Sequence, residues 1–276
     1  MATKKTPITF DSNPFTISFG AFSKFIKYAQ SVFILALIFG FLGFVINIAD
    51  SVIEISDIDN SSTQTTIEED FSLSEVTDEE SGIEIAAIIG IVIIVFVVFT
   101  IVGIAIMSAY KGFLSAANLA ALKEQNIGIK DSWREMNKRF NTLFAAHLIA
   151  AARILGGYVL FVVPGIRAQL RYEALSVIIM NEKDISARQA IDRSKELYNG
   201  HLMEVFGIMT VGGIIPIVGQ AIHHSGVSMS YLQIDAYTKA NKEMPKAHIL
   251  NYIGILFLIG IVVLIGILTL AITATI

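Results

Sequence analysis

The chain has 276 residues, of which 54% are hydrophobic and 16% charged, and it carries a formal net charge of −4 and no cysteine. Soluble domains are about half apolar and about a quarter charged, so this composition indicates apolar surface that is meant for lipid. It excludes disulfide and thiolate chemistry, and the dispersed basic residues argue against nucleic-acid binding. No phosphate-binding loop, dinucleotide fingerprint or zinc-protease motif occurs, so we expect no cofactor.

The N-terminal residues are predicted to be disordered over 1–14. In the next segment, Ile17–Ala29, aromatic residues recur at helical spacing opposite Lys24 and Lys27. This pattern favours a helix that lies in the inner membrane interface. Polar residues precede the first apolar run and no small-x-small cleavage site follows it, so we expect an uncleaved anchor with the N-terminus inside.

Two apolar stretches, Tyr28–Ile48 and Ile85–Ala109, are each long enough to cross a hydrocarbon core about 30 Å thick. Between them lies an acidic loop, residues 50–84, which holds 12 of the 24 Asp and Glu residues and no Lys or Arg. Because basic residues are retained on the cytoplasmic side, we expect this loop to be extracytoplasmic. Its polar composition predicts either a mobile tether or a cation or partner site.

The second half of the chain contains two hairpin patterns and a final apolar run. Asn141–Val163 is interrupted at Pro164 and Gly165 and returns through 166–180, because proline cannot continue a helix. Leu202–Ile222 leads to a tip predicted at His223–Gly226 and returns through 227–237. Residues 249–276 form a last span that ends outside. The predicted fold is an all-α polytopic transmembrane bundle, one domain with about six or seven membrane segments, and it stays open whether both short returns cross fully.

Two short basic segments precede these hairpins, Ser132–Phe140 and Ser186–Tyr198. Each predicts an amphipathic helix along the inner leaflet, and the alternative is a solvated helical face. The side chains expected to contact anionic lipid head groups are Arg134, Lys138, Arg139, Arg188, Arg193 and Lys195.

The two hairpin units also predict an internal repeat, residues 130–183 and 184–240. With an offset of 54 residues, Ser132, Arg134 and Arg139 match Ser186, Arg188 and Arg193. Both copies keep one orientation, so the repeat is predicted to be parallel.

The sequence from Val163-Pro164-Gly165-Ile166 through Arg171-Tyr172 to Ser186–His201 resembles a recurring prokaryotic pattern, PGI followed by S-x-x-A-[IL]-x-x-S-x-x-L-x-x-G. It is similar to a loose group of integral membrane families that includes the YciC-like proteins and the membrane domain of some glycerophosphodiester phosphodiesterases. The resemblance covers about residues 125–240 and implies hairpins joined by cytoplasmic helices. It transfers no active site, and the phosphodiesterase catalytic domain is absent.

Ionisable residues at membrane depth are the strongest functional candidates. Arg153 and Glu173 are predicted to meet as a buried ion pair across the first hairpin, and Glu204 and Asp235 form a second polar set. The first pair either locks the hairpin, or moves ions or a polar substrate, or reaches opposite interfaces.

The adjacent His223 and His224 are a poor metal site, because neighbouring residues on a helix point about 100° apart, and we expect them at the outer interface. Ser225, His224 and Asp235 are the residue types of a hydrolase triad, but no nucleophile elbow or oxyanion-hole signature accompanies them.

The pattern as a whole predicts a non-enzymatic integral protein of the cell membrane, acting through lipids, other membrane proteins or a second copy in scaffolding, assembly or envelope maintenance. The alternative is a small transporter or channel that uses Arg153 and Glu173. A lipid-modifying enzyme is a third hypothesis, for which the sequence offers no catalytic motif.

Overall fold

The structure, a computed structural model, describes residues 9–61 and 79–275, and within them the side chains at 9–45, 48, 87–256, 259–260 and 263–270. The described residues form only helices, which confirms the all-α class. In chain order these are α1 (Pro14–Tyr28), α2 (Gln30–Ser61), α3 (Glu79–Leu122), α4 (Ile129–Asn137), α5 (Phe140–Leu160), α6 (Val162–Tyr172), α7 (Leu175–Asn181), α8 (Ala187–Tyr198), α9 (Leu202–Ile214), α10 (Gly219–Lys239), the 3-10 helix η1 (Ile249–Tyr252) and α11 (Ile253–Thr275).

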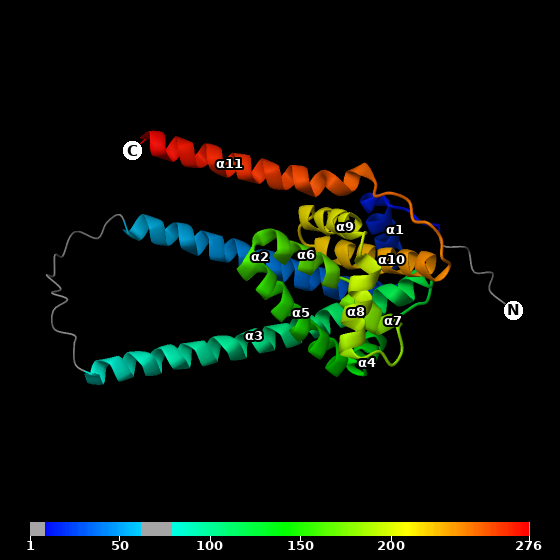
Figure 1. The fold of residues 1–276 in the computed structure, drawn as a ribbon, viewed down its shortest axis with the longest axis horizontal. Coiled ribbons are helices and arrows are strands. Elements are labelled where there is room, and N and C mark those ends of the chain that lie inside the picture. Colours follow the sequence, from blue (N-terminus) through cyan, green and yellow to red (C-terminus); the bar gives the residue numbers. More distant parts are fainter. Residues whose placement is uncertain (1–8, 62–78, 276) are drawn as a thin grey trace.

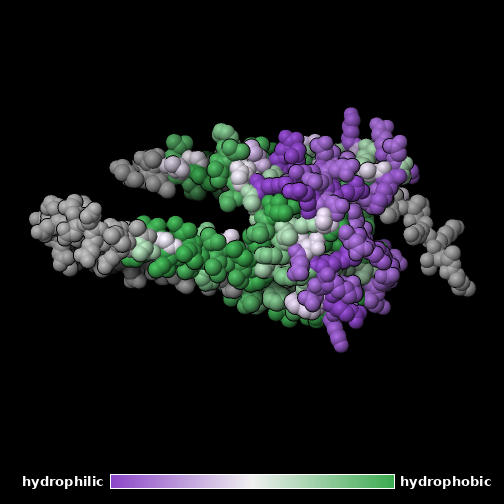
Figure 2. Space-filling view, turned by 60° about the horizontal axis from the view of Figure 1, so that its bottom comes forward, coloured by the Kyte–Doolittle hydropathy of each residue, from purple (hydrophilic) through white to green (hydrophobic). Residues whose placement is uncertain are grey.

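Three long helices, α2, α3 and α11, extend in one direction from a helical body that contains the shorter helices (Figure 1). The longest is α3, whose 44 residues span about 66 Å at 1.5 Å per residue. None of its described side chains in the distal segment, residues 87–107, is buried. The described side chains of the long helices are mostly hydrophobic, and hydrophilic side chains gather at the opposite end of the body (Figure 2).

Two helices are long and apolar enough to cross a membrane, Ala87–Leu122 within α3 and Phe140–Leu160, which is α5. A third candidate arises if α1 and Gln30–Val45 form one span, although the chain bends by 115° between them. The described residues therefore do not support six or seven membrane segments. The expected return segments are short or polar and pack into the body, and α11 contains undescribed side chains, so the predicted last span stays untested.

The acidic segment 50–84 differs from a simple loop, because α2 continues to Ser61 and α3 begins at Glu79. The rest of it, residues 62–78, lies outside the described residues, as do residues 1–8.

Residues 9–13 were predicted to be disordered, but the backbone N–H of Phe10 donates to the Tyr237 hydroxyl at 3.1 Å, and the Asn251 amide donates to the Ser12 carbonyl at 2.8 Å. These contacts attach residues 10–12 to α10 and η1.

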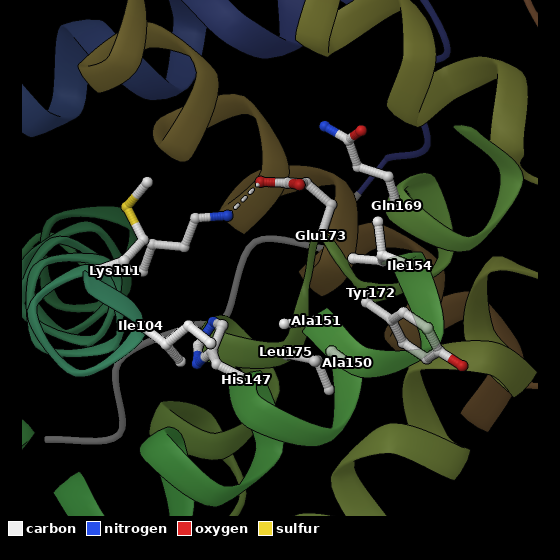
Figure 3. A pocket seen from close by; sticks show the side chains of 11 residues that line it. Ile104, Lys111, His147, Ala150, Ala151, Ile154, Gln169, Tyr172, Glu173 and Leu175 are labelled. Atoms are coloured by element: carbon white, nitrogen blue, oxygen red, sulfur yellow. Dashed lines mark hydrogen bonds and ion pairs between the residues drawn. The ribbon is translucent and has the colours of Figure 1, made fainter. Parts of the chain in front are cut away.

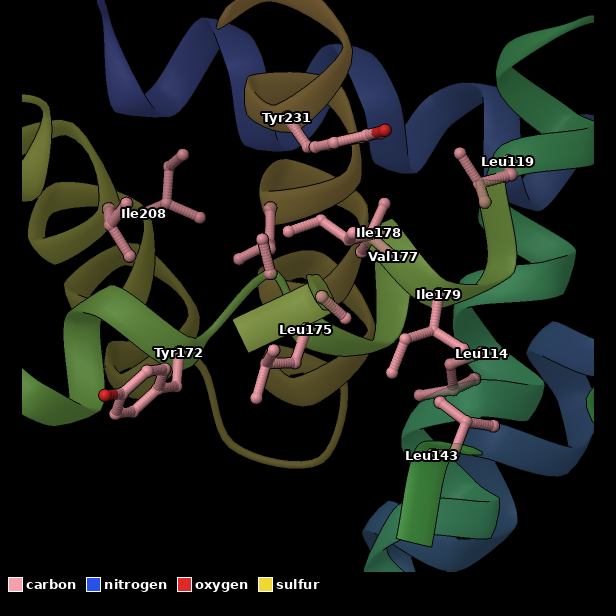
Figure 4. Close-up of a cluster of buried hydrophobic side chains, with 14 of the residues drawn as sticks. Leu114, Leu119, Leu143, Tyr172, Leu175, Val177, Ile178, Ile179, Ile208 and Tyr231 are labelled. Carbon is pink, nitrogen blue, oxygen red and sulfur yellow. The ribbon is translucent and has the colours of Figure 1, made fainter. Parts of the chain in front are cut away.

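The shortest α-helix, α7, lies at the centre of the hydrophobic core (Figure 4). Its side chains at Leu175, Val177, Ile178 and Ile179 are at most 1% exposed. The sequence predicted one membrane return helix over 166–180. The structure divides that stretch into α6 and α7 around residues 173–174, which is where the chain turns into the core.

The first hairpin, α5–α6, turns at Phe161, whose backbone is extended with φ −165° and ψ 159°. Pro164 and Gly165 follow the turn in the first part of α6, where a missing N–H costs no helical hydrogen bond. A methyl group added at Gly157 would lie 3.0 Å from the Gly165 Cα atom, so the two helices cross at a pair of glycines. The predicted break is therefore found within three residues of its expected place.

The second hairpin turns at residues 215–218, and the prediction of a tip at His223–Gly226 is wrong. Pro216 has no N–H to donate, and Ile217 adopts a positive φ of 66°. The turn therefore forms at the proline, and α10 begins at Gly219 and carries both histidines into the body.

The two basic segments form α4 and α8 at the hydrophilic end of the body (Figures 1 and 2). Ser186 caps α8 in a capping box with Gln189. Each basic helix precedes a hairpin, the order expected of the two predicted repeats. The first return is divided into α6 and α7, whereas the second is the continuous helix α10.

Candidate functional site

A polar stripe runs along the proximal segment of α3, residues 108–122, on the side that faces the body. Ser108, Lys111, Ser115 and Asn118 recur at intervals of three or four residues, which places them on one helix face. The two serines and the asparagine are fully buried. The Ser225 hydroxyl of α10 donates to the Asn118 side-chain oxygen at 2.6 Å, so the stripe is bonded to α10.

An ion pair between α3 and the α6–α7 junction lies at the start of this stripe (Figure 3). The Lys111 ammonium donates to Glu173 Oε1 at 3.1 Å, and the side chains are 21% and 6% exposed. Burial alone would raise the pKa of the Glu173 carboxyl, but the positive charge of Lys111 holds it below the ordinary value. Pairing offsets the cost of burying either charge alone.

The histidines of α10 border this pair from inside the body. His223 Nε2 lies 3.6 Å from Glu173 Oε1, which is too long for a hydrogen bond. The two histidine rings stack with centroids 5.4 Å apart, and His224 meets the Tyr110 ring edge to face. They are 8% and 3% exposed, so the expectation that they lie at the outer interface is wrong.

A third histidine, His147 on α5, has both ring nitrogens in hydrogen-bond contact. Its Nδ1 donates to the Leu143 carbonyl at 2.8 Å, and the Ser176 hydroxyl donates to Nε2 at 3.1 Å. No group of three or more His, Cys, Asp or Glu side chains suited to a metal ion occurs in the described part of the chain.

The ion pair and His147 line a cavity of about 220 Å³ between α3, α5 and the α6–α7 junction (Figure 3). Its other polar lining comes from Gln169 and Tyr172. The apolar lining residues are Ile104, Met107, Ala150, Ala151, Ile154 and Leu175. The arrangement combines one cation and one anion with a largely apolar enclosure, which suits binding of a small polar group.

The predicted pair of Arg153 and Glu173 does not form. Arg153 is exposed on α5, and its guanidinium donates to the Tyr172 hydroxyl at 3.4 Å. Glu173 takes Lys111 as its partner, because α3 packs against the α6–α7 junction. The serines and asparagine that share the face of Lys111 are the sequence signal for an inward-facing lysine.

The second predicted set, Glu204 and Asp235, consists of two separate contacts. Glu204 is 3% exposed and its carboxylate lies 3.1 Å from the ring Nδ1 of His201. Asp235 accepts hydrogen bonds from Arg193 and Lys239, each at 2.7 Å. These contacts tie α10 to α8 and to its own last turn.

The six predicted lipid contacts divide into two groups. Arg139 donates to the backbone carbonyls of Ile179 and Glu182 and so anchors the end of α7. Arg193 is 20% exposed and pairs with Asp235 and Glu196. Both guanidiniums are therefore held by protein groups, and lipid contact stays a prediction for all six side chains. The exposed side chains are Arg134, Lys138, Arg188 and Lys195.

No family model, no curated protein and no solved structure matches the chain. The resemblance of residues 125–240 to YciC-like membrane families therefore stays a prediction.

Proposed function

We propose that this chain is a non-enzymatic integral protein of the cell membrane that acts by binding lipids and other membrane proteins. The observation that carries this proposal is the distal segment of α3. Phe96 and Phe99 are 71% and 72% exposed there, and Ile94 is 63% exposed. A long helix with apolar side chains on every side is stable only in lipid or against apolar protein.

The orientation we propose places the hydrophilic end of the body in the cytoplasm and the distal ends of α2 and α3 outside. The distribution of basic residues supports it, since exposed Lys and Arg side chains occur on α4 and α8. The described acidic positions of this segment, within 50–61 and 79–84, lie at the far ends of α2 and α3. Basic residues remain on the cytoplasmic side of membranes.

The body itself is proposed to be partly embedded in the inner leaflet. Val159, Phe161 and Val163 at the tip of the α5–α6 hairpin are 74% to 78% exposed, although all three are apolar. The 11 residues of α6 reach about 16 Å, which is about half of a hydrocarbon core. We infer that α6 is too short to cross and that the hairpin tip lies within the membrane, although α5, with 21 residues, is long enough to cross.

Cysteine labelling tests the orientation. A cysteine at Ser62 reacts with an impermeant thiol reagent in whole cells, and one at Gln125 reacts only after permeabilisation. The natural chain has no cysteine, so it serves as the unlabelled control. Reaction at Gln125 in intact cells, or none at Ser62, overturns the proposed topology.

Photo-crosslinking tests binding through α3. A photoreactive residue at Phe96 is expected to crosslink lipids or a second protein in native membranes. The same residue at Phe113, which is 5% exposed, crosslinks only within the chain. Equal external crosslinking at both positions contradicts the proposal.

The second candidate function is a small transporter or channel, and the specific observation in its favour is the buried Lys111–Glu173 pair beside a cavity. A neutral double variant, Lys111→Met with Glu173→Gln, distinguishes the two functions. Binding without transport leaves crosslinking at Phe96 unchanged, and proteoliposomes with the natural chain then show no solute flux that the variant could lose. Transport through this site gives a flux that the variant abolishes while the protein stays folded.

A further inference from the structure

The cavity beside Lys111 opens towards the lipid-facing surface of the molecule. Met107 lines it and is 53% exposed, and its neighbour Ile106 is 66% exposed. On the α5 side, Ile154 lines the cavity and the adjacent Leu155 is 65% exposed. A ligand that enters the cavity from the bilayer would therefore pass between α3 and α5.

The inner wall of the cavity carries both signs of charge. The Lys111 ammonium has three N–H groups, and it donates one hydrogen bond to Glu173. A purely anionic group would meet the Glu173 carboxylate, and a purely cationic group would meet Lys111. A ligand with one phosphate and one ammonium matches the two charges without leaving either unpaired.

The depth and size of the site fit the head group of a lipid. Lys111 follows directly on the exposed apolar segment of α3, so it lies where hydrocarbon gives way to head groups. Drug-sized ligands occupy pockets of about 300–1,000 Å³. The cavity of about 220 Å³ is smaller than that, so it has room for a head group and not for a whole lipid. The small side chains of Ala150 and Ala151 leave this space open.

We propose that this cavity binds the zwitterionic head group of an aminophospholipid. The lipid phosphate approaches the Lys111 ammonium, the primary ammonium of the lipid donates to the Glu173 carboxylate, and the acyl chains follow the exposed faces of α3 and α5. A quaternary ammonium has no N–H to donate, so a choline lipid loses a charge-assisted hydrogen bond and binds about tenfold more weakly. This proposal rests on the proposed membrane function and names one lipid class for it.

The test is native mass spectrometry of the full chain, released from nanodiscs that contain equal amounts of phosphatidylethanolamine, phosphatidylcholine and phosphatidylglycerol. One retained phosphatidylethanolamine per protein is expected. Ala151→Phe fills the cavity and removes this preference. Ala152→Phe is the matched control, because Ala152 is the next residue of the same helix, is exposed and does not line the cavity.

Further measurements separate the site from other causes. Ile154→Trp also fills the cavity and is expected to have the same effect, and thermal unfolding in lipid-free detergent shows whether each variant is folded. Soluble phosphoethanolamine is the probe for a free solute, and it is expected to give no thermal shift at concentrations where the diacyl lipid does.

Four results overturn the proposal: equal retention of the choline lipid, retention of phosphatidylglycerol alone, an unchanged preference in a folded Ala151→Phe protein, or a full response to soluble phosphoethanolamine. None of these changes the labelling pattern at Ser62 and Gln125. A failure of the lipid site is therefore distinct from a failure of the proposed membrane orientation.

Discussion

The two segments of α3 belong to one uninterrupted helix and have opposite surroundings. In the distal segment, residues 87–107, apolar side chains are exposed all round, whereas residues 112–119 of the proximal segment are all buried. The proximal segment buries polar groups, Ser108, Ser115 and Asn118, each at 0% exposure. Hydropathy thus marks the part of the helix that meets lipid, and polar and small residues mark the part that meets protein.

The largest effect on stability is expected when the charge that the proximal segment contributes is removed. Lys111→Met leaves the Glu173 carboxylate buried without a cation and is expected to lower the free energy of unfolding by about 3–5 kcal/mol. Adding Glu173→Gln restores part of that loss, which denaturant titration in mixed micelles measures.

Arg153→Met is the control for that experiment. It removes an exposed guanidinium that makes a long hydrogen bond to the Tyr172 hydroxyl, so the free energy of unfolding is expected to change by no more than about 0.5 kcal/mol. Strictly additive effects of Lys111→Met and Glu173→Gln would show that the two side chains do not interact.

A matched pair of aliphatic truncations compares the packing of the two segments directly. Leu114 is 0% exposed and Ile94 is 63% exposed on the same helix. Leu114→Ala is expected to cost about 2–5 kcal/mol of unfolding free energy, because it leaves a cavity in the body. Ile94→Ala is expected to cost well under half of that, since lipid fills the space. Comparable losses in the same titration would mean that the distal segment packs against protein.

The point where α2 leaves the body is tested with glycine substitutions. A methyl group at Gly40 would overlap the backbone carbonyl of Ile217, whereas one at Gly103 of α3 would meet no atom within 4 Å. Gly40→Ala is expected to cost about 1–3 kcal/mol through overpacking. Gly103→Ala is expected to be neutral or to stabilise by up to about 1 kcal/mol through helix propensity. Thermal unfolding distinguishes these outcomes, and a neutral Gly40→Ala would place α2 away from the turn at residues 215–218.

The smallest expected effects concern the hydrophilic surface of the body. Replacing the exposed Arg134, Lys138, Arg188 or Lys195 by glutamine is expected to weaken enrichment of anionic lipid by about 1 kcal/mol for each charge. Lipid analysis of the purified protein measures this enrichment. Arg139→Gln is the contrasting variant, because its guanidinium holds the end of α7 and its loss lowers stability. Unchanged lipid enrichment in all four variants would indicate a merely solvated helical face.

Some features of the fold and the site are predictable from the sequence, and others are not. The apolar runs, the proline-marked hairpin and the basic helices α4 and α8 were predictable, because proline chemistry and hydrophobic periodicity act locally. The predicted tip of the second hairpin, His223–Gly226, lies about eight residues too late, because the chain turns around Pro216 and α10 already contains both histidines. The ion pair was assigned to the wrong cation because Arg153 and Glu173 are near in sequence, whereas Lys111 lies 62 residues from Glu173.

Composition and charge pattern by themselves determined that the chain is helical and rich in apolar surface, and that its acidic and basic segments are separated along the chain. These properties depend on each residue's own solvation and backbone preference. Only the tertiary structure decided that α7 lies at the centre of the core and that His223 and His224 are internal. It also decided that Lys111 pairs with Glu173 beside a cavity. Those outcomes depend on which helices come together, and a pattern of apolar residues is the same whether lipid or protein covers it.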